Sequence, residues 1–393
     1  MNSRIRSIEN RTMVQPAGLR MYFRSRARCV SFDEKDATMK QATDSFSSAD
    51  PTSRLLLKLS VALLLSGGAQ RISAWDYEGH RFVNQLALSA LPTNFPSFVR
   101  TPAARERIAF LSGEPDRWRN TPELTLRHVN APDHFLDLED LAPYQMKPEA
   151  LSPFRYEYTA QLGVARSQRP NDFPPVDPEK NADRTRTLPG FLPWTITEYY
   201  GKLKSAFSYL RAYEEAGTAE EIVNAQQNII YLMGVMGHFV GDASQPLHTT
   251  KHYNGWVGPN PKRYPTNATF HAWIDGGYIR QAEIKLADLK ARPARVLTAT
   301  PANGKPEEVF PVVMDFILAQ HKLVEPLYVL EQTGRLSATH VDPRGREFIV
   351  RQLSVGAEML ADVWLTAWQH APPDKYLLTQ LARRKAEAAS PKP

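Results

Sequence analysis

Apolar positions along this chain recur mainly at three- and four-residue spacing, which is the spacing of one face of a helix. Five segments show the pattern: 80–91, 195–217, 218–245, 306–333 and 344–370. Thr218 stands at the N-cap position of the third segment. We find no convincing alternation of apolar and polar residues and no internal repeat. The pattern predicts an all-α fold, a single mainly helical domain with long loops.

Two stretches depart from this pattern. Residues 140–193 are rich in proline and charge, and we expect a long loop over the site here rather than a linker, because the segments on both sides carry one set of candidate metal ligands. The tail beyond Arg384 is small and charged, so we expect it to be disordered. The expected organisation is a leader at 1–74, a helical domain at 75–375 and a C-terminal tail at 376–393.

The leader predicts a secretory signal peptide over about 39–74. Basic residues precede a short apolar run at 59–65, and small residues lead to Ala74. This order is typical of a signal peptide, and the run is too short for a permanent membrane anchor. We therefore expect a secreted or periplasmic protein. A mature N-terminal helix is the alternative, and Met39 rather than Met1 is a candidate start.

The net charge of the chain is concentrated in that leader. The formal net charge is +6; of the 48 basic and 42 acidic residues, 12 and 6 lie in 1–74, so the remainder holds 36 of each. A neutral body disfavours tight binding of a long nucleic-acid duplex, because neutralisation of phosphates drives that affinity. Cys29, the single cysteine, also lies in the leader, so a processed chain would contain no disulfide.

Imidazole and carboxylate side chains recur within 237–275. In chain order they are His238, Asp242, His248, His271 and Asp275. The first two and the last two are each four residues apart, so each pair would share a helix face. Pro246 should end the first helix and leave the third of these residues on the turn beyond it. Neutral imidazole with carboxylate is the ligand set expected for zinc, although a single such pair is more often solvated or capping.

A further candidate ligand lies at the expected cleavage site. Cleavage after Ala74 would make Trp75 the first residue, and its α-amino nitrogen and carbonyl oxygen could chelate a metal as a five-membered ring. His80 follows five residues later and opens the first amphipathic helix. The expected cut therefore has a chemical reason, since it would complete a metal site.

As a set, these motifs resemble the S1/P1 family of zinc-dependent single-strand nucleases. Three spacings carry the resemblance: Trp75-x4-His80, His238-x3-Asp242-x5-His248 and His271-x3-Asp275. The resemblance covers about 75–370. Bacterial zinc-dependent phospholipases C are relatives in the same superfamily, but their last motif typically ends in glutamate and their first histidine lies further along.

The resemblance implies more site residues between the first two motifs. Asp116 and Arg119 match the family's Asp-x-x-Arg element, which makes Asp116 a ligand and Arg119 a cation that faces the phosphate. His134 and Asp137 match its His-Phe-x-Asp element, which makes His134 a ligand and places Asp137 at the substrate site. His128 is the alternative to His134.

A cleft with three zinc ions is what the resemblance implies. Carried over residue by residue, the expected ligand sets are Asp116, His134, His238 and Asp242; His248, His271 and Asp275; and Trp75, His80 and a shared oxygen of Asp242. Asp116, Arg119 and Asp242 would be the catalytic residues, acting with a zinc-bound hydroxide. Tyr253 and Trp256 in the following loop are candidates for stacking on a base, although loop aromatics more often only pack.

The implied activity is hydrolysis of single-stranded DNA or RNA to 5′-phosphorylated products by a monomer without an obligate protein partner. The alternatives are a zinc-dependent phospholipase C acting on lipid head groups and a non-catalytic zinc-binding protein. The chain departs from the family pattern at Ser244, where a histidine often stands, and at Trp273, which lies two residues before Asp275 rather than one. These departures leave base preference and substrate class open.

Overall fold

The computed structural model describes residues 75–299, 305 and 308–389. The expected signal peptide, the alternative start at Met39 and the cysteine lie outside the described residues. In the part of the chain that is described, none of the helices combines the length and the hydrophobicity needed to cross a bilayer.

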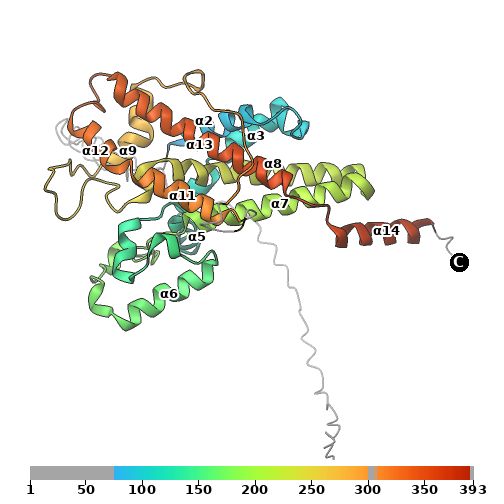
Figure 1. Ribbon diagram of the computed structural model, residues 1–393, viewed down its shortest axis with the longest axis horizontal. Helices are drawn as coiled ribbons and strands as arrows, with labels where there is room; N and C mark the ends of the chain where they lie inside the picture. Colours follow the sequence, from blue (N-terminus) through green and yellow to red (C-terminus); the bar gives the residue numbers. More distant parts are fainter. Residues whose placement is uncertain (1–74, 300–304, 306–307, 390–393) are drawn as a thin grey trace, which may run out of the picture. The chain divides into compact units, whose positions relative to one another are not determined.

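The described chain is built from helices (Figure 1). The longer ones are α2 (Tyr77–Ala90), α3 (Pro102–Leu111), α6 (Arg155–Gln168), α7 (Leu192–Ala216), α8 (Ala219–Ser244), α11 (Phe310–His321), α12 (Val324–Gln332), α13 (Pro343–Gln369) and α14 (Lys375–Ala389). The shorter ones include α4 (Glu114–Arg119), α5 (Leu124–Asn130), α9 (Phe270–Ala272) and α10 (Tyr278–Gln281). No β-strand occurs among the described residues, where an isolated antiparallel bridge pairs Leu136 with Gly190. The predicted all-α class is confirmed.

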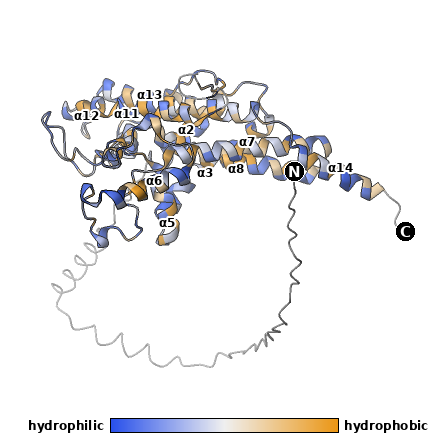
Figure 2. Cartoon of the chain, turned by 60° about the horizontal axis from the view of Figure 1, so that its bottom comes forward, coloured by the Kyte–Doolittle hydropathy of each residue, from blue (hydrophilic) through white to orange (hydrophobic). Residues whose placement is uncertain are grey.

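Helix α8 is the central element of the packing. It lies along α7 and also packs against α2, α3 and α13 (Figure 1). Its residues 233–244 are all buried, whereas its first half is partly exposed. Both hydrophobic and hydrophilic residues occur along α7 and α8 (Figure 2), as expected for helices with one face in the core. The buried half of α8 therefore brings any polar side chain it carries into the interior.

Asn84 ties three helices together beneath the candidate site. Its side chain is fully buried, and its Nδ2 donates to the carbonyl of Ile108 on α3 at 2.8 Å and to that of Gly234 on α8 at 3.0 Å. Gly234 also permits the close approach of α3, because a Cβ there would lie 2.5 Å from the Cβ of Leu111. These contacts fix α2 against α8, and with it His80, which lies one turn before Asn84.

The helical pattern expected within 306–333 is confirmed, and two helices carry it. Helix α11 ends at His321 before α12 begins at Val324. Pro326 explains the break, because it lacks a backbone N–H and its ring would clash with the carbonyl of Lys322 in a continuous helix.

The expected loop at 140–193 contains a helix of 14 residues, α6. Tyr158 and Leu162 of α6 are buried, and the ring of Tyr158 stacks on that of Trp194 with centroids 4.0 Å apart. The rest of the segment is a series of 3₁₀ turns and irregular chain. The proline content predicted the irregular parts, while the burial of one apolar face explains the helix.

The expectation of disorder beyond Arg384 is wrong for 385–389, which belong to α14. This helix packs on α7, with Leu381 buried. Arg384 binds both carboxylate oxygens of Glu221 on α8, at 2.7 and 2.8 Å. A single apolar anchor and a forked ion pair thus hold a helix whose composition alone is typical of a tail. Residues 390–393 lie outside the described part.

The start of α8 offers a direct test of how the ligand-bearing helix is held. Thr218 accepts a hydrogen bond from the amide of Glu221, whose side chain accepts one from the amide of Thr218, which is a capping box and confirms the predicted cap. We expect Thr218→Ala to lower the free energy of unfolding by about 1 kcal/mol. Thr218→Ser keeps the hydroxyl and is the matched control. Denaturant unfolding with equal midpoints for both variants would contradict this assignment.

Candidate metal centre

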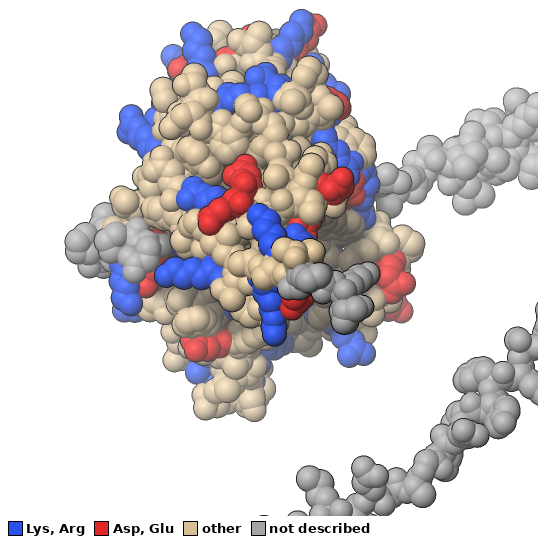
Figure 3. Space-filling model, turned by 90° about the vertical axis from the view of Figure 1, so that its right-hand side faces the viewer, with Lys and Arg blue, Asp and Glu red and all other residues tan. Residues whose placement is uncertain are grey.

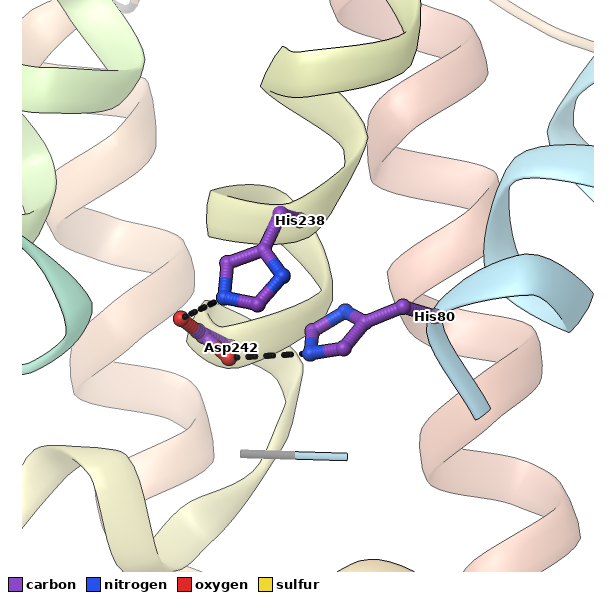
Figure 4. A group of neighbouring side chains, drawn as sticks. All are labelled: His80, His238 and Asp242. Carbon is purple, nitrogen blue, oxygen red and sulfur yellow. Dashed lines mark ion pairs between the residues drawn. The ribbon is translucent and has the colours of Figure 1, made fainter. Parts of the chain in front are cut away.

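The last turns of α8 carry two of the predicted ligands. His238 and Asp242 lie on successive turns and are completely buried (Figure 4). The Nε2 of His238 is 3.3 Å from Oδ2 of Asp242. The helix ends before Pro246, and the 3₁₀ turn η8 (Pro246–Thr249) then carries His248, as the sequence predicts.

The second His-x3-Asp pair comes from a distorted helix. His271 lies in α9, and Asp275 lies in the π-turn η9 (Trp273–Gly277) that follows directly. The Nε2 of His271 is 3.1 Å from Oδ2 of Asp275 and 2.9 Å from Nε2 of His248. Single π-turns within helices occur frequently at functional sites. The predicted pairing is present, with a local backbone geometry that the spacing does not reveal.

Helix α4 and the 3₁₀ turn η3 (Ala131–His134) supply two further candidate ligands. Asp116 lies on α4, where Nε of Arg119 is 3.5 Å from its Oδ1. His134 is the last residue of η3, and its Nδ1 lies 2.9 Å from Oδ2 of Asp242. The structure therefore brings both residues to the buried end of α8.

His128, the alternative to His134, lies elsewhere. It is exposed on α5, and its Nδ1 lies 2.8 Å from the carbonyl oxygen of Asp183, to which it donates. The chain thus places His134 rather than His128 in the centre.

Three groups of ligand atoms meet at this point. They are His80, His238 and Asp242; Asp116, His134 and His238; and His248, His271 and Asp275. Within each group, one ligand atom from every residue lies within 4.8 Å of the others. The His80 ring stacks on that of His238 with centroids 3.9 Å apart, and its Nε2 lies 3.4 Å from Oδ1 of Asp242 (Figure 4). One group matches an expected ligand set in full, that of His248, His271 and Asp275. In the other two, His238 takes part twice, Asp242 lies in the group of His80 but not in that of Asp116, and Trp75 is not a member.

Hydrogen bonds to main-chain carbonyls set the tautomers of two imidazoles. Nδ1 of His238 lies 2.7 Å from the carbonyl of Ser112, and Nδ1 of His248 lies 2.6 Å from that of His134. A carbonyl can only accept, so both rings carry their proton on Nδ1 and present an unprotonated Nε2 to the centre. This is the arrangement that orients imidazoles as metal ligands.

The donor set fits a cation. His80 is fully buried and neither of its ring nitrogens has a hydrogen-bond partner among the described residues; the same holds for Oδ1 of Asp242 and Oδ2 of Asp275. Unpartnered polar atoms in the interior are costly, and nitrogen lone pairs directed at carboxylate oxygens repel each other. A divalent ion removes both problems, and imidazole with carboxylate suits zinc. The residues can therefore hold metal ions in three adjacent positions.

Burial lowers the pKa values of the imidazoles in the centre and raises those of its carboxyls. Desolvation lowers the pKa of His238 to about 4 and that of His248 to about 3. Desolvation also raises the pKa of Asp242 and of Asp275 well above the ordinary value. The charge of Arg119 adds to burial in lowering the pKa of His134. The imidazoles are thus unprotonated at neutral pH and ready to bind metal, while burial favours the protonated form of the ion-free carboxyls.

The first described residue, Trp75, also lies at the centre. Its side chain is completely buried, and the amide of Asp76 donates to the carbonyl of Asp275 at 3.0 Å. The segment that carries His80 is thereby tied to the last ligand segment. The expected cleavage after residue 74 lies outside the described residues.

The residues expected to contact substrate have different surroundings. The Tyr253 ring lies beside that of His271, with centroids 5.7 Å apart. Trp256 stacks on His252 at 3.9 Å, and its indole N–H donates to the carbonyl of Pro259. Tyr253 thus borders the metal ligands, whereas Trp256 makes the packing contacts named as the alternative for loop aromatics.

Asp137 is 93% buried and lies three residues beyond His134. Its Oδ1 has no hydrogen-bond partner among the described residues. Desolvation, with the nearby charges of Asp140 and Glu139, raises its pKa well above the ordinary value. Its substrate contact stays a prediction; the structure shows a buried carboxyl with one unpartnered oxygen among the described residues.

Sequence reasoning missed Gln245. This fully buried side chain donates from Nε2 to Oδ1 of Asp275 at 2.7 Å and accepts from the amide of Leu247 at 2.7 Å. It therefore orients the carboxylate of Asp275 and shapes the turn that presents His248. Its position between Asp242 and His248 was a usable signal.

Comparisons with protein-family models, with curated proteins and with solved structures found no match to this chain. The resemblance to zinc-dependent nucleases therefore rests on the sequence motifs alone.

We expect zinc binding to the ion-free protein at pH 7 to release protons from the buried carboxyls. The pKa of Asp242 and of Asp275 is raised by burial, so an incoming cation displaces their protons, whereas the imidazoles have none to lose. Calorimetric titration in two buffers of different ionisation enthalpy measures the number released. Asp275→Asn should lower that number, and identical heats in the two buffers would contradict the assignment.

Proposed function

We propose that this chain is a zinc-dependent phosphodiester hydrolase that cleaves single-stranded nucleic acid and leaves the phosphate on the 5′ end of the product. The observation that carries the proposal is the position of Asp242 between ligand groups. Its Oδ1 lies 3.4 Å from Nε2 of His80, and its Oδ2 lies 2.9 Å from Nδ1 of His134. One carboxylate can therefore serve two neighbouring ions, which is the arrangement needed to hold both reacting oxygens of a phosphodiester.

Zinc bound at these groups would lower the pKa of a coordinated water toward about 7 and polarise a phosphoryl oxygen. The chain's own residues contribute position and charge. Asp116 and Arg119 lie one turn apart on α4, so a phosphate drawn to the guanidinium is placed beside the ligand group of Asp116 and His134. Burial of the ligands supplies a low dielectric, in which these interactions are stronger than in water.

The charge and the aromatic residues of the chain support a single strand as the substrate. The body has equal numbers of basic and acidic residues, and both signs are mixed on the face shown in Figure 3. Duplex binding depends on a field of positive charge, whereas unpaired bases stack on aromatic rings at about 1–3 kcal/mol per base. Tyr253 borders the ligands, and Asp137 offers a buried acceptor for a base or sugar hydroxyl.

A second candidate function is lipid head-group hydrolysis, and helix α5 is the observation that favours it. None of its residues is buried, and Leu124, Leu126 and Val129 are 44%, 39% and 56% exposed. This helix joins the segment of Asp116 to that of His134, so its aliphatic side chains lie next to the metal ligands in the chain. Such residues suit contact with a lipid surface, whereas the aromatic and acidic residues noted above suit nucleotides.

The decisive experiment compares substrates under one set of conditions. Purified protein loaded with zinc is incubated with single-stranded DNA, with RNA and with phosphatidylcholine vesicles, and product ends are mapped with a 5′-phosphate-dependent exonuclease. We expect 5′-phosphorylated oligonucleotides, and we expect chelation to abolish their formation. Lipid turnover without nucleotide release would replace this proposal by the second one. Three bound ions without hydrolysis of any phosphodiester would favour a non-catalytic zinc protein.

Arg119 provides a test within the site. We expect Arg119→Ala to lower kcat on single-stranded DNA by about 10²–10³-fold, because an oriented cation is lost from the phosphate. Arg117→Ala is the matched control on the same helix: Arg117 pairs with Glu114 and stacks over Phe110. The control should keep activity within about twofold. Equal loss in both variants, or retention of zinc by neither, would assign Arg119 to structure rather than to catalysis.

A further inference from the structure

The indole of Trp75 lies in a buried position at the end of α8, formed by Gly241 and Ser244, which we call the indole seat. The side chain is completely buried, and its N–H donates to the carbonyl of Gly241 at 3.0 Å. The same N–H lies 3.3 Å from Oγ of Ser244. That hydroxyl donates its own proton to the carbonyl of Gly241 at 2.7 Å, so its lone pairs face the indole. The two acceptors flank Asp242 on the last turn of the helix.

Two glycines make the space for this seat. A Cβ on Gly241 would lie 2.8 Å from Nδ1 of His80, so glycine lets that ring approach the helix, while Cδ1 of Trp75 would be in ordinary contact at 3.8 Å. A Cβ on Gly356 of α13 would lie 2.6 Å from Oγ of Ser244. The seat is therefore tightly enclosed, and the side chain at 244 must be short.

The backbone that follows Trp75 is anchored as well. The amide of Asp76 donates to the carbonyl of Asp275 at 3.0 Å. Asp76 also caps α2 through the amide of Gly79 and pairs with Arg280. Next to the cap, a Cβ on Gly79 would lie 3.0 Å from Cβ of Trp75. Residue 75 is thus held on one side by its indole and on the other by its peptide bond to residue 76.

We infer that Ser244, together with the carbonyl of Gly241, is a positioning element for the metal centre. It holds the indole of Trp75 on the turn of α8 that carries Asp242, and so fixes the backbone of residue 75, which would complete the group of His80 and Asp242 after cleavage behind Ala74. Ser244 touches no ligand atom of the three groups; it acts through Trp75. This inference rests on the proposed function in that zinc binds at the group of His80 and Asp242, and on the expected cleavage after Ala74, which would free the nitrogen of Trp75.

The test measures zinc affinity site by site. The full chain is expressed for export, its N-terminus is read by mass spectrometry, and the ion-free protein is titrated with zinc against a chromophoric chelator. We expect Ser244→Ala to weaken one of three zinc ions by about 10–100-fold and to leave the other two within about twofold. Trp75→Phe keeps the backbone ligands and removes the indole N–H, so it should weaken the same ion.

The two substitutions should not be additive, because both remove one side of the same hydrogen bond. Ser354→Ala is the matched control: Ser354 is also buried, but its hydroxyl donates to the carbonyl of Val350 on α13, and no zinc ion should be affected. In a chain that keeps residues 1–74, the nitrogen of Trp75 is part of a peptide bond. In that chain, Ser244→Ala should therefore not lower the zinc affinity further.

A readout without metal separates positioning from general destabilisation. In ¹H–¹⁵N spectra of the ion-free protein, the indole signal that Trp75→Phe removes should shift in Ser244→Ala while the other indole signals stay. Additive losses, or wild-type affinity for all three ions in Ser244→Ala, would overturn the inference. If the unaltered protein binds no zinc, the proposed function is rejected. An unshifted indole signal in Ser244→Ala would separately show that Ser244 does not position Trp75.

Discussion

The constraint on which the structure depends is the burial of several carboxyl and imidazole groups next to one another at the end of α8. Asp242 is completely buried among His80, His134 and His238, and its two oxygens face different rings. Without a cation, burial forces protons onto the carboxyls and off the imidazoles, because each charged form alone is unfavourable in a low dielectric. Bound metal restores the carboxylate charge and uses the nitrogen lone pairs. The cost of burying these groups would therefore be offset only when they bind a cation together.

The rest of the fold keeps that set in place. Helix α8 is capped at its start and fully buried at its end, so its two ligands are presented from a rigid support. Asn84 fixes α2 against the same helix, and Gln245 fixes Asp275 on the following segment. His80 lies on α2 and Asp116 on the short helix α4, whereas the remaining ligands come from short helical turns. The main-chain carbonyls of Ser112 and His134 orient the rings of His238 and His248.

Much of this centre could be predicted from residue spacing. Four-residue spacing placed His238 with Asp242, and Pro246 located the turn that carries His248, because both follow from local backbone rules. The π-turn at Asp275 and the bonds of Gln245 depend on tertiary packing, which local patterns do not contain. The helix α14 was missed for the same reason: Arg384 finds its partner Glu221 on a helix far away in the chain.

Metal ligands alone do not determine which phosphodiester is cleaved, since the same groups serve a nucleotide or a lipid head group. Discrimination must come from the side chains around them. Trp256 contacts His252 and Pro259, so of the two candidate loop aromatics Tyr253 is the one whose ring lies beside a ligand ring, that of His271. A base stacked there would bring its phosphate to the group of His271 rather than to that of His134. Under the proposed function, a second, linked phosphate would then reach Arg119 beside Asp116, and a polynucleotide supplies such a phosphate whereas a single lipid head group does not.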